Sequence, residues 1–273
     1  MPELPEVETI RRYLREGGRD YPAILGMRVS AATLYWAKSL ADPEAETFPR
    51  RITGQSVQEV GRRGKFLLLS LQPDTLLIHL RMSGDLRVEP VASAVQTHDR
   101  MALDFDTGWR LAFNDPRKFG RLWLVDDPQR VLAGLGPEPL NDSFTPQWLA
   151  DALRIRRRQL KPLLLDQGFI AGLGNIYADE ALHMARLHPL TVSNSVTAEQ
   201  AQALHQAIHS VLNEGIRRNG ASFDWVYRGG EFQNYFRVYA REDEECPVCG
   251  TRIVRILAGQ RSTHFCPRCQ VPQ

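Results

Sequence analysis

Lysine is scarce in this chain of 273 residues, because arginine supplies 30 of its 34 basic side chains. The four lysines are Lys38, Lys65, Lys118 and Lys161. Lysine titrates readily when it is buried and arginine does not, so a lysine in such a chain is a candidate for chemistry that arginine cannot perform. The net charge of only +2 permits a polyanionic partner but does not indicate one.

Long apolar runs are also missing. The longest, such as FLLLSL at 66–71, have the length of a strand and fall far short of a membrane span. The first residues, MPELPEVETI, carry acidic side chains where a signal peptide needs basic ones followed by an apolar stretch. These absences predict a cytoplasmic protein with no membrane partner. The sequence carries no signal for oligomerisation, so a monomer is expected.

The first half of the chain has the texture of a β protein. Residues 6–16 predict an amphipathic helix, with Glu early and Arg late as the helix dipole prefers. From residue 26 to 125, short β-rich runs such as KFLLLSL and TLLIHLRM are separated by Gly, Pro or Asp turns, which favours an antiparallel sandwich or barrel. Residues 41–50 are expected to form a surface loop.

The second half has helical patterns. Thr145 with Pro146 indicates a helix start, and Thr197 with Gln200 forms a capping-box pattern. Residues 219–236 are glycine-rich, aromatic and aperiodic, which predicts a mobile loop. The fold class expected is α+β. Its parts are a β-sandwich domain at 1–132, a linker at 133–143, a helical domain at 144–240 and a cysteine module at 241–273.

All four cysteines lie in that last module and form two C-x₂-C pairs separated by sixteen residues: Cys246, Cys249, Cys266 and Cys269. Two such knuckles are a strong zinc signal, since four thiolates give closed tetrahedral coordination. The alternative of two disulfides or a redox dithiol is disfavoured in an intracellular chain. We therefore expect one structural zinc ion in a β-hairpin, with Arg261 near the hairpin turn, where it suits contact with nucleic acid.

A glycine turn lies between two predicted helices. One helix is expected to end at Gly168, the turn covers residues 172–174, and Asn175 starts the next helix. Glycines let backbone N–H groups converge on an anion, and a helix N-terminus adds positive potential. Asn175 is thus a candidate phosphate clamp, with Lys161 nearby. A plain helix–turn–helix, in which the glycines only permit close packing, remains equally open on spacing alone.

The amino terminus raises a similar alternative. Removal of the initiator methionine would make Pro2 a terminal secondary amine, which can condense with an aldehydic carbon to give a positively charged iminium. Glu3 and Glu6 would lie beside it as proton-transfer groups. The alternative is that Pro2 and Pro5 merely start a helix whose dipole the glutamates complement, and composition alone favours it.

Four dispersed motifs together favour a catalytic Pro2 over a plain helix start. PELPEVE at 2–8, DPRKFG at 115–120, GLGNIYADEAL at 172–182 and the paired cysteine knuckles resemble the formamidopyrimidine-DNA glycosylase family. These bacterial repair enzymes remove oxidised purines such as 8-oxoguanine. The resemblance runs in order from residue 2 to residue 269, so it covers essentially the whole chain.

The resemblance implies a catalytic group at the terminus. Pro2 matches the nucleophile that attacks C1′ of the damaged nucleoside, after which β- and δ-elimination cut the strand on both sides. Glu3 matches the proton-transfer carboxylate, and Glu6 a supporting acid. Lys65, in GRRGKFLLL, matches an essential lysine at the start of a strand, which agrees with the scarcity of lysine.

It also implies a damaged double-stranded DNA partner, a nucleoid-associated location, and a fold of β-sandwich, helix–two-turns–helix domain and zinc finger. Apolar wedges can fill the space that a flipped-out base vacates, and arginine can hydrogen-bond the orphaned base. The loop at 219–236 corresponds to the one that closes over the everted base. The positions that match DNA contacts are Met82, Arg117 and Phe119 inside the duplex, and His98, Lys161, Asn175 and Arg261 along the DNA backbone.

Two alternatives share this scaffold. Endonuclease VIII has the same fold but prefers oxidised pyrimidines, and its terminus resembles PEGPE. Leu4 in PELPE and the Arg-x-Phe of DPRKFG favour the purine enzyme. The second alternative is a non-catalytic DNA-damage-binding protein, which would use the zinc finger and the arginines without the terminal amine.

Overall fold

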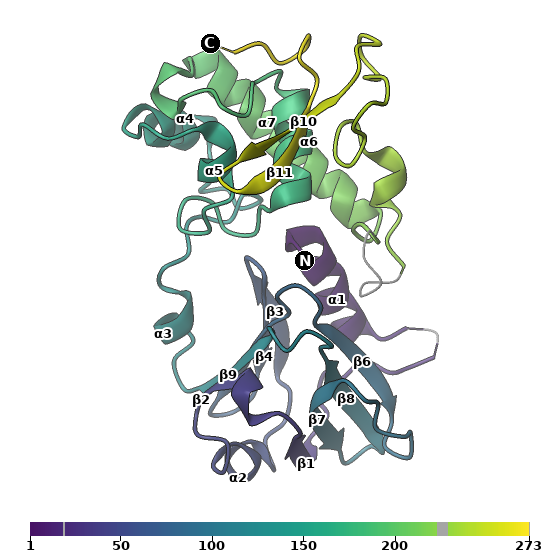
Figure 1. The fold of residues 1–273 in the computed structure, drawn as a ribbon. Helices are drawn as coiled ribbons and strands as arrows, with labels where there is room; N and C mark the ends of the chain where they lie inside the picture. Colours follow the sequence, from purple (N-terminus) through teal and green to yellow (C-terminus); the bar gives the residue numbers. More distant parts are fainter. Residues whose placement is uncertain (19, 223–228, 273) are drawn as a thin grey trace. The chain divides into compact units, whose positions relative to one another are not determined.

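The computed structural model of the chain describes residues 1–18, 20–222 and 229–272, which divide into two compact units (Figure 1). The first unit comprises residues 1–2, 6–133 and 222, and the second comprises 3–5, 134–221 and 229–272. Helix α1, Leu4–Glu16, begins in the second unit and continues in the first. Within the described residues, no helix is both long and apolar enough to cross a membrane.

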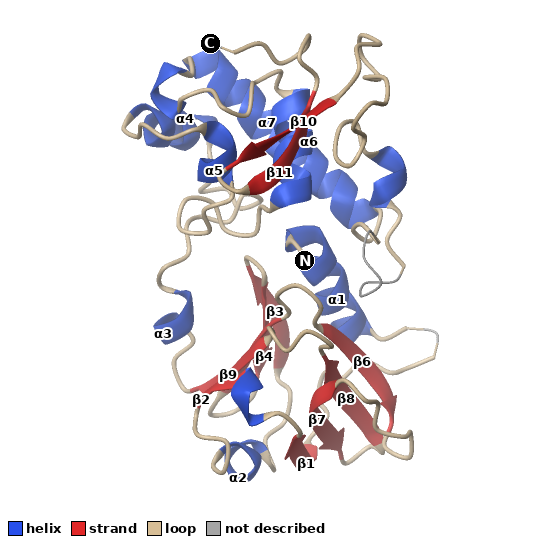
Figure 2. Ribbon diagram, in the orientation of Figure 1, coloured by secondary structure: helices blue, strands red, loops and turns tan. Residues whose placement is uncertain are grey.

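The first unit is built on two β-sheets (Figure 2). In its described part the strand orders are β1-β7-β8-β6 and β2-β9-β5-β4-β3, and neighbouring strands are antiparallel except for the parallel pair β2 and β9. The strands are β1 Val29–Leu34, β2 Leu40–Asp42, β3 Glu59–Arg63, β4 Phe66–Ser70, β5 Thr75–His79, β6 Asp85–Pro90, β7 Asp99–Phe105, β8 Trp109–Asn114 and β9 Arg121–Val125.

The core of this unit lies between the two sheets, as the sandwich prediction requires. Leu67 and Leu69 of β4 are buried, while the residues between and beside them are less so, because successive side chains of a strand point to opposite faces. Helix α1 packs Val7, Ile10 and Leu14 into the same core, at the three- and four-residue spacing of one helical face. The predicted β-sandwich with an N-terminal helix is confirmed.

The expectation of a surface loop at residues 41–50 holds for residues 43–47 only and is wrong at both ends of the stretch. Strand β2 ends at Asp42, and helix α2, Phe48–Ile52, begins inside the stretch. Phe48 and Ile52 are fully buried in the sandwich core. The two apolar side chains are four residues apart and therefore lie on one face of a helical turn, which buries them together.

The second unit is mainly helical and has its own apolar core. Both predicted helix starts are confirmed: Thr145 accepts the backbone N–H of Trp148 at 3.0 Å, and Thr197 forms a complete capping box with Gln200. The α-helices of its described part are α4 Pro146–Arg154, α5 Leu160–Leu164, α6 Asn175–Met184 and α7 Ala198–Arg217, while the short α3, Gln129–Leu132, belongs to the first unit.

Helix α5 ends at Leu164, so the prediction of a helix that continues to Gly168 is wrong. The side chain of Gln167 explains the difference. Its Nε2 donates to the carbonyl oxygens of Leu165 and Leu173, and its Oε1 accepts the N–H of Gly172 at 2.9 Å. These bonds hold residues 165–173 as a compact turn, and α6 then begins at Asn175, as expected.

The predicted loop at 219–236 is only partly described, because residues 223–228 lie outside the described residues. The short 3₁₀ helix η3, Phe232–Tyr235, ends the segment. Phe232 and Phe236 are buried, and the ring of Phe232 stacks on Tyr177 of α6 with centroids 5.0 Å apart. Phe232 and Phe236 therefore belong to the helical core, which corrects the expectation of a mobile loop for that part.

The C-terminal hairpin follows the prediction. Strands β10, Val254–Ala258, and β11, Arg261–Phe265, pair antiparallel. Gly259 and Gln260 between them have φ values of 55° and 60°, the left-handed conformations that a two-residue hairpin turn requires.

Candidate functional site

The amino terminus precedes helix α1 directly. Pro2 and Glu3 are buried, while Met1 is 40% exposed. With Met1 attached, the ring nitrogen of Pro2 is a peptide nitrogen. The terminus thus presents an accessible methionine in front of a buried proline.

The carboxylate of Glu3 lies at the N-terminus of helix α6. Its Oε1 accepts the backbone N–H of Ile176 at 3.0 Å, and its Oε2 accepts that of Tyr177 at 3.4 Å. The first amides of a helix lack partners inside the helix, and the helix dipole adds positive potential at this end. These donors and this field compensate the burial of a carboxylate that is adjacent in sequence to Pro2.

The glycine turn before α6 provides the space for this contact. A Cβ at Gly174 would overlap the carboxyl group of Glu3, and a Cβ at Gly172, which has a φ of +95°, would lie 2.7 Å from Cδ1 of Leu4. The N–H of Leu4 donates to the carbonyl oxygen of Gly172 at 3.0 Å. The glycines therefore permit close packing, as the plain helix–turn–helix alternative expects, and the side chain of Glu3 occupies the N-terminus of α6, while a phosphate contact by Asn175 stays a prediction.

Lys161 is buried completely and pairs inside the protein. Its Nζ donates to Oδ1 of Asp179 at 2.6 Å and to the carbonyl oxygen of Asn175 at 2.8 Å. Burial lowers the pKa of Lys161, and the charge of Asp179 opposes that effect. Oδ2 of Asp179 accepts the N–H of His264 on β11 at 2.9 Å. The pair joins α5, α6 and the hairpin, so its geometry favours a structural role for Lys161, and the expected phosphate contact stays a prediction.

Asn175 is the first residue of α6, and Arg261 directly follows the hairpin turn nearby. Nδ2 of Asn175 donates to the carbonyl oxygen of Ser262 at 2.9 Å, next to Arg261. Arg261 is exposed at the start of β11. The hydrogen bond thus fixes the hairpin to the start of α6 at the residue beside an accessible guanidinium.

Glu6 and Lys65 are both buried in the first unit. Lys65 follows Gly64, which has a φ of +57°, in the turn between β3 and β4. Its neighbour Phe66 pairs across the sheet with His79 and contacts that ring edge-on at 4.7 Å. The turn therefore places Lys65 just before the start of strand β4, beside the end of β5.

Sequence reasoning missed His79, which lies in this neighbourhood. Its burial lowers the pKa of His79 to about 3, and the charges of Arg81 and Lys65 add to the effect. Nδ1 accepts the N–H of Arg81 at 3.0 Å, so Nε2 carries the proton of the neutral ring. Its place in the apolar run TLLIHLRM gave no signal beyond that of a strand residue.

The residues expected to enter the duplex occupy two turns of the first unit. Met82 follows β5, and Arg117 and Phe119 lie between β8 and β9. Met82 and Phe119 are 38% and 48% exposed, and the guanidinium of Arg117 lies 5.1 Å from the centre of the Phe119 ring. His98 is exposed, and its carbonyl oxygen accepts the N–H of Asp115, so it lies beside the second turn.

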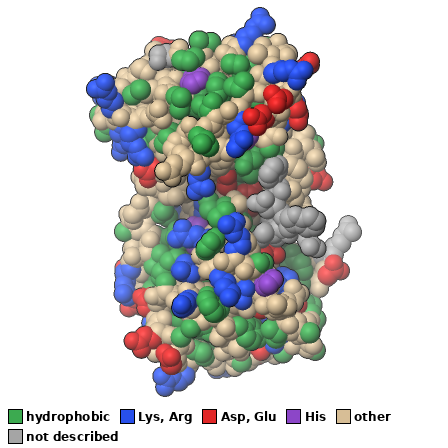
Figure 3. All heavy atoms as spheres, in the orientation of Figure 1, with side chains coloured by type: hydrophobic (Ala, Val, Ile, Leu, Met, Phe, Trp, Pro, Cys, Tyr) green, Lys and Arg blue, Asp and Glu red, His purple; other side chains and the backbone are tan. Residues whose placement is uncertain are grey.

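Basic side chains accompany these turns. On the face drawn in Figure 3, Lys and Arg side chains gather over the first unit among exposed hydrophobic ones. This combination of positive charge and accessible apolar side chains suits a surface that contacts both the phosphates and the bases of a nucleic acid.

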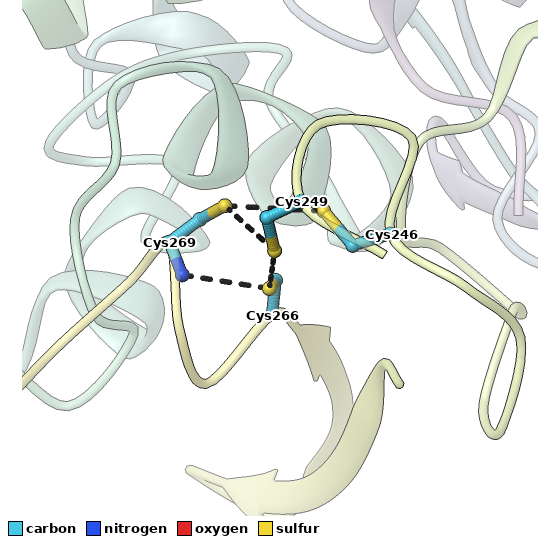
Figure 4. A group of neighbouring side chains, drawn as sticks. All are labelled: Cys246, Cys249, Cys266 and Cys269. Atoms are coloured by element: carbon cyan, nitrogen blue, oxygen red, sulfur yellow. Dashed lines mark hydrogen bonds between the residues drawn. The ribbon is translucent and has the colours of Figure 1, made fainter. Parts of the chain in front are cut away.

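The four cysteine sulfurs form one compact cluster and are not paired as disulfides (Figure 4). All four lie within 4.8 Å of one another, with separations of 3.4 Å for Cys249 and Cys266, 3.5 Å for Cys249 and Cys269, and 3.9 Å for Cys246 and Cys269. Four sulfurs at about 2.3 Å from a central zinc stand about 3.8 Å apart in a tetrahedron. The cluster therefore fits one structural zinc ion, which four protein ligands enclose.

Helix α6 also contacts this metal centre. Nε2 of His183 lies 3.4 Å from Sγ of Cys246. The carboxylate of Glu180 accepts the N–H groups of Arg237, Val238 and Tyr239 at 2.8–3.0 Å. One helix thus holds Glu3 at its start and the cysteine module near its end.

Three family models match the chain in order. Residues 1–122 match the formamidopyrimidine-DNA glycosylase N-terminal domain, residues 135–225 match the H2TH domain of the same enzymes, and residues 243–271 match the zinc finger found in FPG and IleRS. Fold and site define a zinc-finger DNA glycosylase of the DNA-repair class. The chain belongs to the formamidopyrimidine-DNA glycosylase family.

Similar proteins extend over the same full length. The formamidopyrimidine-DNA glycosylase of Chloroflexus aurantiacus is 48% identical, covering 99% of this chain and 98% of that protein, and that of Protochlamydia amoebophila is 40% identical over 99% of both. The structure of a Lactococcus lactis FPG mutant in complex with DNA containing Fapy-dG has a TM-score of 0.91 at 34% identity, covering 99% of this chain and all of that one. The predicted fold class and family are therefore confirmed.

Proposed function

We propose that this protein is a bifunctional base-excision repair enzyme that removes 8-oxoguanine and formamidopyrimidines from duplex DNA and then cleaves the strand. Removal of Met1 converts the ring nitrogen of Pro2 to a secondary amine. The amine bonds to C1′ of the damaged nucleoside, and the base leaves with the electron pair of the glycosidic bond and takes up a proton. Opening of the sugar gives an iminium, which activates the 2′ proton for β-elimination of one phosphate and δ-elimination of the other.

The placement of Glu3 carries this proposal. Its carboxylate is adjacent to Pro2, buried, and held by the N–H groups of Ile176 and Tyr177. A fixed carboxyl group beside the nucleophile can transfer protons to and from the sugar, a contribution of typically about 100- to 10,000-fold. We assign Glu6 as a supporting acid and Lys65 as a further catalytic group, both buried in the first unit.

The DNA contacts are proposed on the same grounds. Met82 and Phe119 are exposed apolar side chains that can fill the space left by a flipped-out base, with Arg117 next to them to bond the orphaned partner base. Arg261, His98 and Asn175 are assigned to the DNA backbone. The zinc ion orders the hairpin that presents Arg261 and takes no part in the chemistry.

The choice of oxidised purines rests on the sequence of the terminus and on similar proteins. Solved structures of similar enzymes contain DNA with Fapy-dG or with carbocyclic 8-oxo-G. Duplexes with one 8-oxoguanine, one formamidopyrimidine or one oxidised pyrimidine separate the possibilities. Faster excision of the pyrimidine would support the endonuclease VIII alternative, and lesion binding without any excision would support the non-catalytic one.

Glu3→Gln in protein that lacks Met1 tests the catalytic assignment. Glutamine keeps an oxygen that can accept N–H groups of α6 but cannot transfer a proton. Single-turnover excision of 8-oxoguanine should fall by about 100-fold or more, while the Kd for the same duplex changes by only a few-fold. Equal losses of excision and binding would contradict a catalytic role.

Glu16→Gln is the matched control, because Glu16 is an exposed glutamate at the C-terminal end of helix α1, which Glu3 directly precedes. It should leave both excision and binding unchanged.

A further inference from the structure

Two turns that cross between the sheets of the first unit meet at one buried hydrogen-bonded pair. The turn that contains Met82 leads from β5 in one sheet to β6 in the other, and the turn that contains Arg117 and Phe119 leads back from β8 to β9. Ser83 and Asp115, the pair in question, are almost fully buried, with Asp115 1% exposed.

The serine hydroxyl joins the two turns. Oγ of Ser83 donates to Oδ1 of Asp115 and accepts the backbone N–H of Arg117 at 3.2 Å. The backbone of Met82 is therefore one residue from a group that bonds both the start and the middle of the other turn.

The aspartate closes its own turn. Oδ2 of Asp115 accepts the N–H of Gly120 at 2.7 Å, its N–H donates to the carbonyl oxygen of His98, and its carbonyl oxygen accepts Nε of Arg100 at 2.8 Å. Each end of the DPRKFG turn is thus fixed at the same residue, and a buried polar network that is fully bonded is rigid.

The ring of Phe113 lies beneath both turns. A Cβ at Gly84 would lie 2.9 Å from Cε2 of this ring, and a Cβ at Gly120 would overlap its Cζ. The side chain of Phe113 is fully buried. The two turns therefore pack on the same ring and are joined by the hydrogen bonds of Ser83 and Asp115, which together are called the clamp.

We propose that Ser83 and Asp115 are positioning residues that hold Met82, Arg117 and Phe119 as one preformed unit for insertion into DNA. This inference rests on the proposed function of the three exposed side chains. A wedge of fixed geometry enters the base stack without first losing conformational freedom, so the step at which the damaged base leaves the duplex is the step that the clamp accelerates.

Ser83→Ala, Asp115→Asn and the double variant test the clamp. The rate of base eversion is followed by the fluorescence of 2-aminopurine next to 8-oxoguanine, and excision is followed in single turnovers. Both should slow by roughly ten- to hundredfold in each single variant. The rates of the double variant should fall by clearly less than the product of the two single effects, because both changes break one network.

Cleavage of a preformed abasic site separates positioning from a general structural defect. An abasic site has no base to extract from the stack, so its cleavage should change by less than about threefold in Ser83→Ala. Equal slowing of excision and abasic-site cleavage, or wild-type eversion in Ser83→Ala, would overturn the proposal.

Ser193→Ala is the matched control. Ser193 is a buried serine of the second unit that likewise donates to one oxygen, that of Arg156, and accepts one backbone N–H, that of Arg158. It should share any loss in Tm with Ser83→Ala but leave the eversion rate unchanged. If the wild-type protein binds 8-oxoguanine DNA without excising it, the proposed function fails. The 2-aminopurine fluorescence still tests the clamp in that case, because it compares the eversion rates of the wild type and Ser83→Ala.

Discussion

The carboxylate of Glu3 lies 3.0 Å from the backbone nitrogen of Ile176, although the two residues are 173 positions apart in the chain. This contact fixes the residue that follows the proposed nucleophile on the first turn of helix α6. Gly174 leaves the space that the carboxylate of Glu3 occupies, so a side chain at this position should disrupt the contact.

Gly174→Ala should displace Glu3, because the added Cβ would overlap its carboxyl group. We expect a destabilisation of about 1–3 kcal/mol, typical of overpacking. The rate of 8-oxoguanine excision should fall by more than the fraction of unfolded protein explains, since the carboxylate of Glu3 is displaced from the amides of α6. Thermal unfolding and single-turnover excision measure the two effects.

Gly134→Ala is the control for this substitution, since a Cβ at Gly134 would meet no heavy atom within 4 Å in the described structure. It should alter neither property. Normal excision by Gly174→Ala would contradict the role of the contact.

Lys161→Met should destabilise the fold by about 3–5 kcal/mol, because Asp179 would remain buried without its cationic partner. Urea unfolding measures this loss. The result also separates two roles for the residue: unchanged stability with weaker, less salt-dependent DNA binding would restore a phosphate contact in place of the structural role.

Arg261→Ala should show the opposite pattern. The side chain is exposed on the hairpin, so stability should change by less than about 0.5 kcal/mol. The slope of log binding constant against log salt concentration should fall in magnitude by about one, as expected when one phosphate contact is lost. An unchanged slope would remove Arg261 from the DNA interface.

His79 should make stability depend on pH. Its pKa is lowered to about 3 from 6.5 mainly by burial. The unfolded chain therefore takes up the proton first as the pH falls, so this contribution to stability is fully present above pH 6.5 and is lost between pH 6.5 and about pH 3. The loss amounts to about 2 kcal/mol between pH 6.5 and pH 5.

His79→Asn keeps an acceptor for the N–H of Arg81 but cannot titrate. Urea unfolding at pH 7, 6 and 5 should show a shallower decline for the variant than for the wild type. Parallel declines would mean that the buried ring is not responsible.

Cys249→Ser should lose the zinc ion and the order of the hairpin together, since one of four thiolate ligands is removed from a closed site. Zinc content by mass spectrometry should fall from one per chain, and DNA binding should weaken. Val248→Ser, an exposed neighbour on the same knuckle, should keep both. Retention of a full zinc ion by Cys249→Ser would contradict the four-cysteine site.

Features set by local sequence were predictable. The caps at Thr145 and Thr197 depend on residues three positions apart, and the hairpin turn at Gly259 and Gln260 depends on two. The cysteine spacing likewise specified the metal cluster. The caps and the turn join residues that are neighbours in the chain, and the two C-x₂-C pairs form a known metal-binding pattern although the pairs themselves are far apart in sequence.

Features set by tertiary packing were not predictable in the same way. Phe48 reads as part of a polar loop and is buried, because a sandwich core far away in sequence receives it. Lys161 was expected near a phosphate of the DNA, and only the fold reveals Asp179 opposite it. The glycine turn left a phosphate clamp and plain close packing equally open, and only the fold reveals the carboxylate of Glu3 at the start of α6.

Pro2 is the proposed nucleophile, and it gains its free amine only when Met1 is removed. Mass spectrometry of the purified chain establishes whether the terminus is proline, and borohydride reduction during reaction with an 8-oxoguanine duplex then traps the covalent intermediate. We expect an adduct whose DNA fragment is attached to the N-terminal peptide at Pro2, and no adduct in protein that retains Met1. An adduct on Lys65 or another lysine, or no adduct with a proline terminus, would rule out Pro2 as the nucleophile.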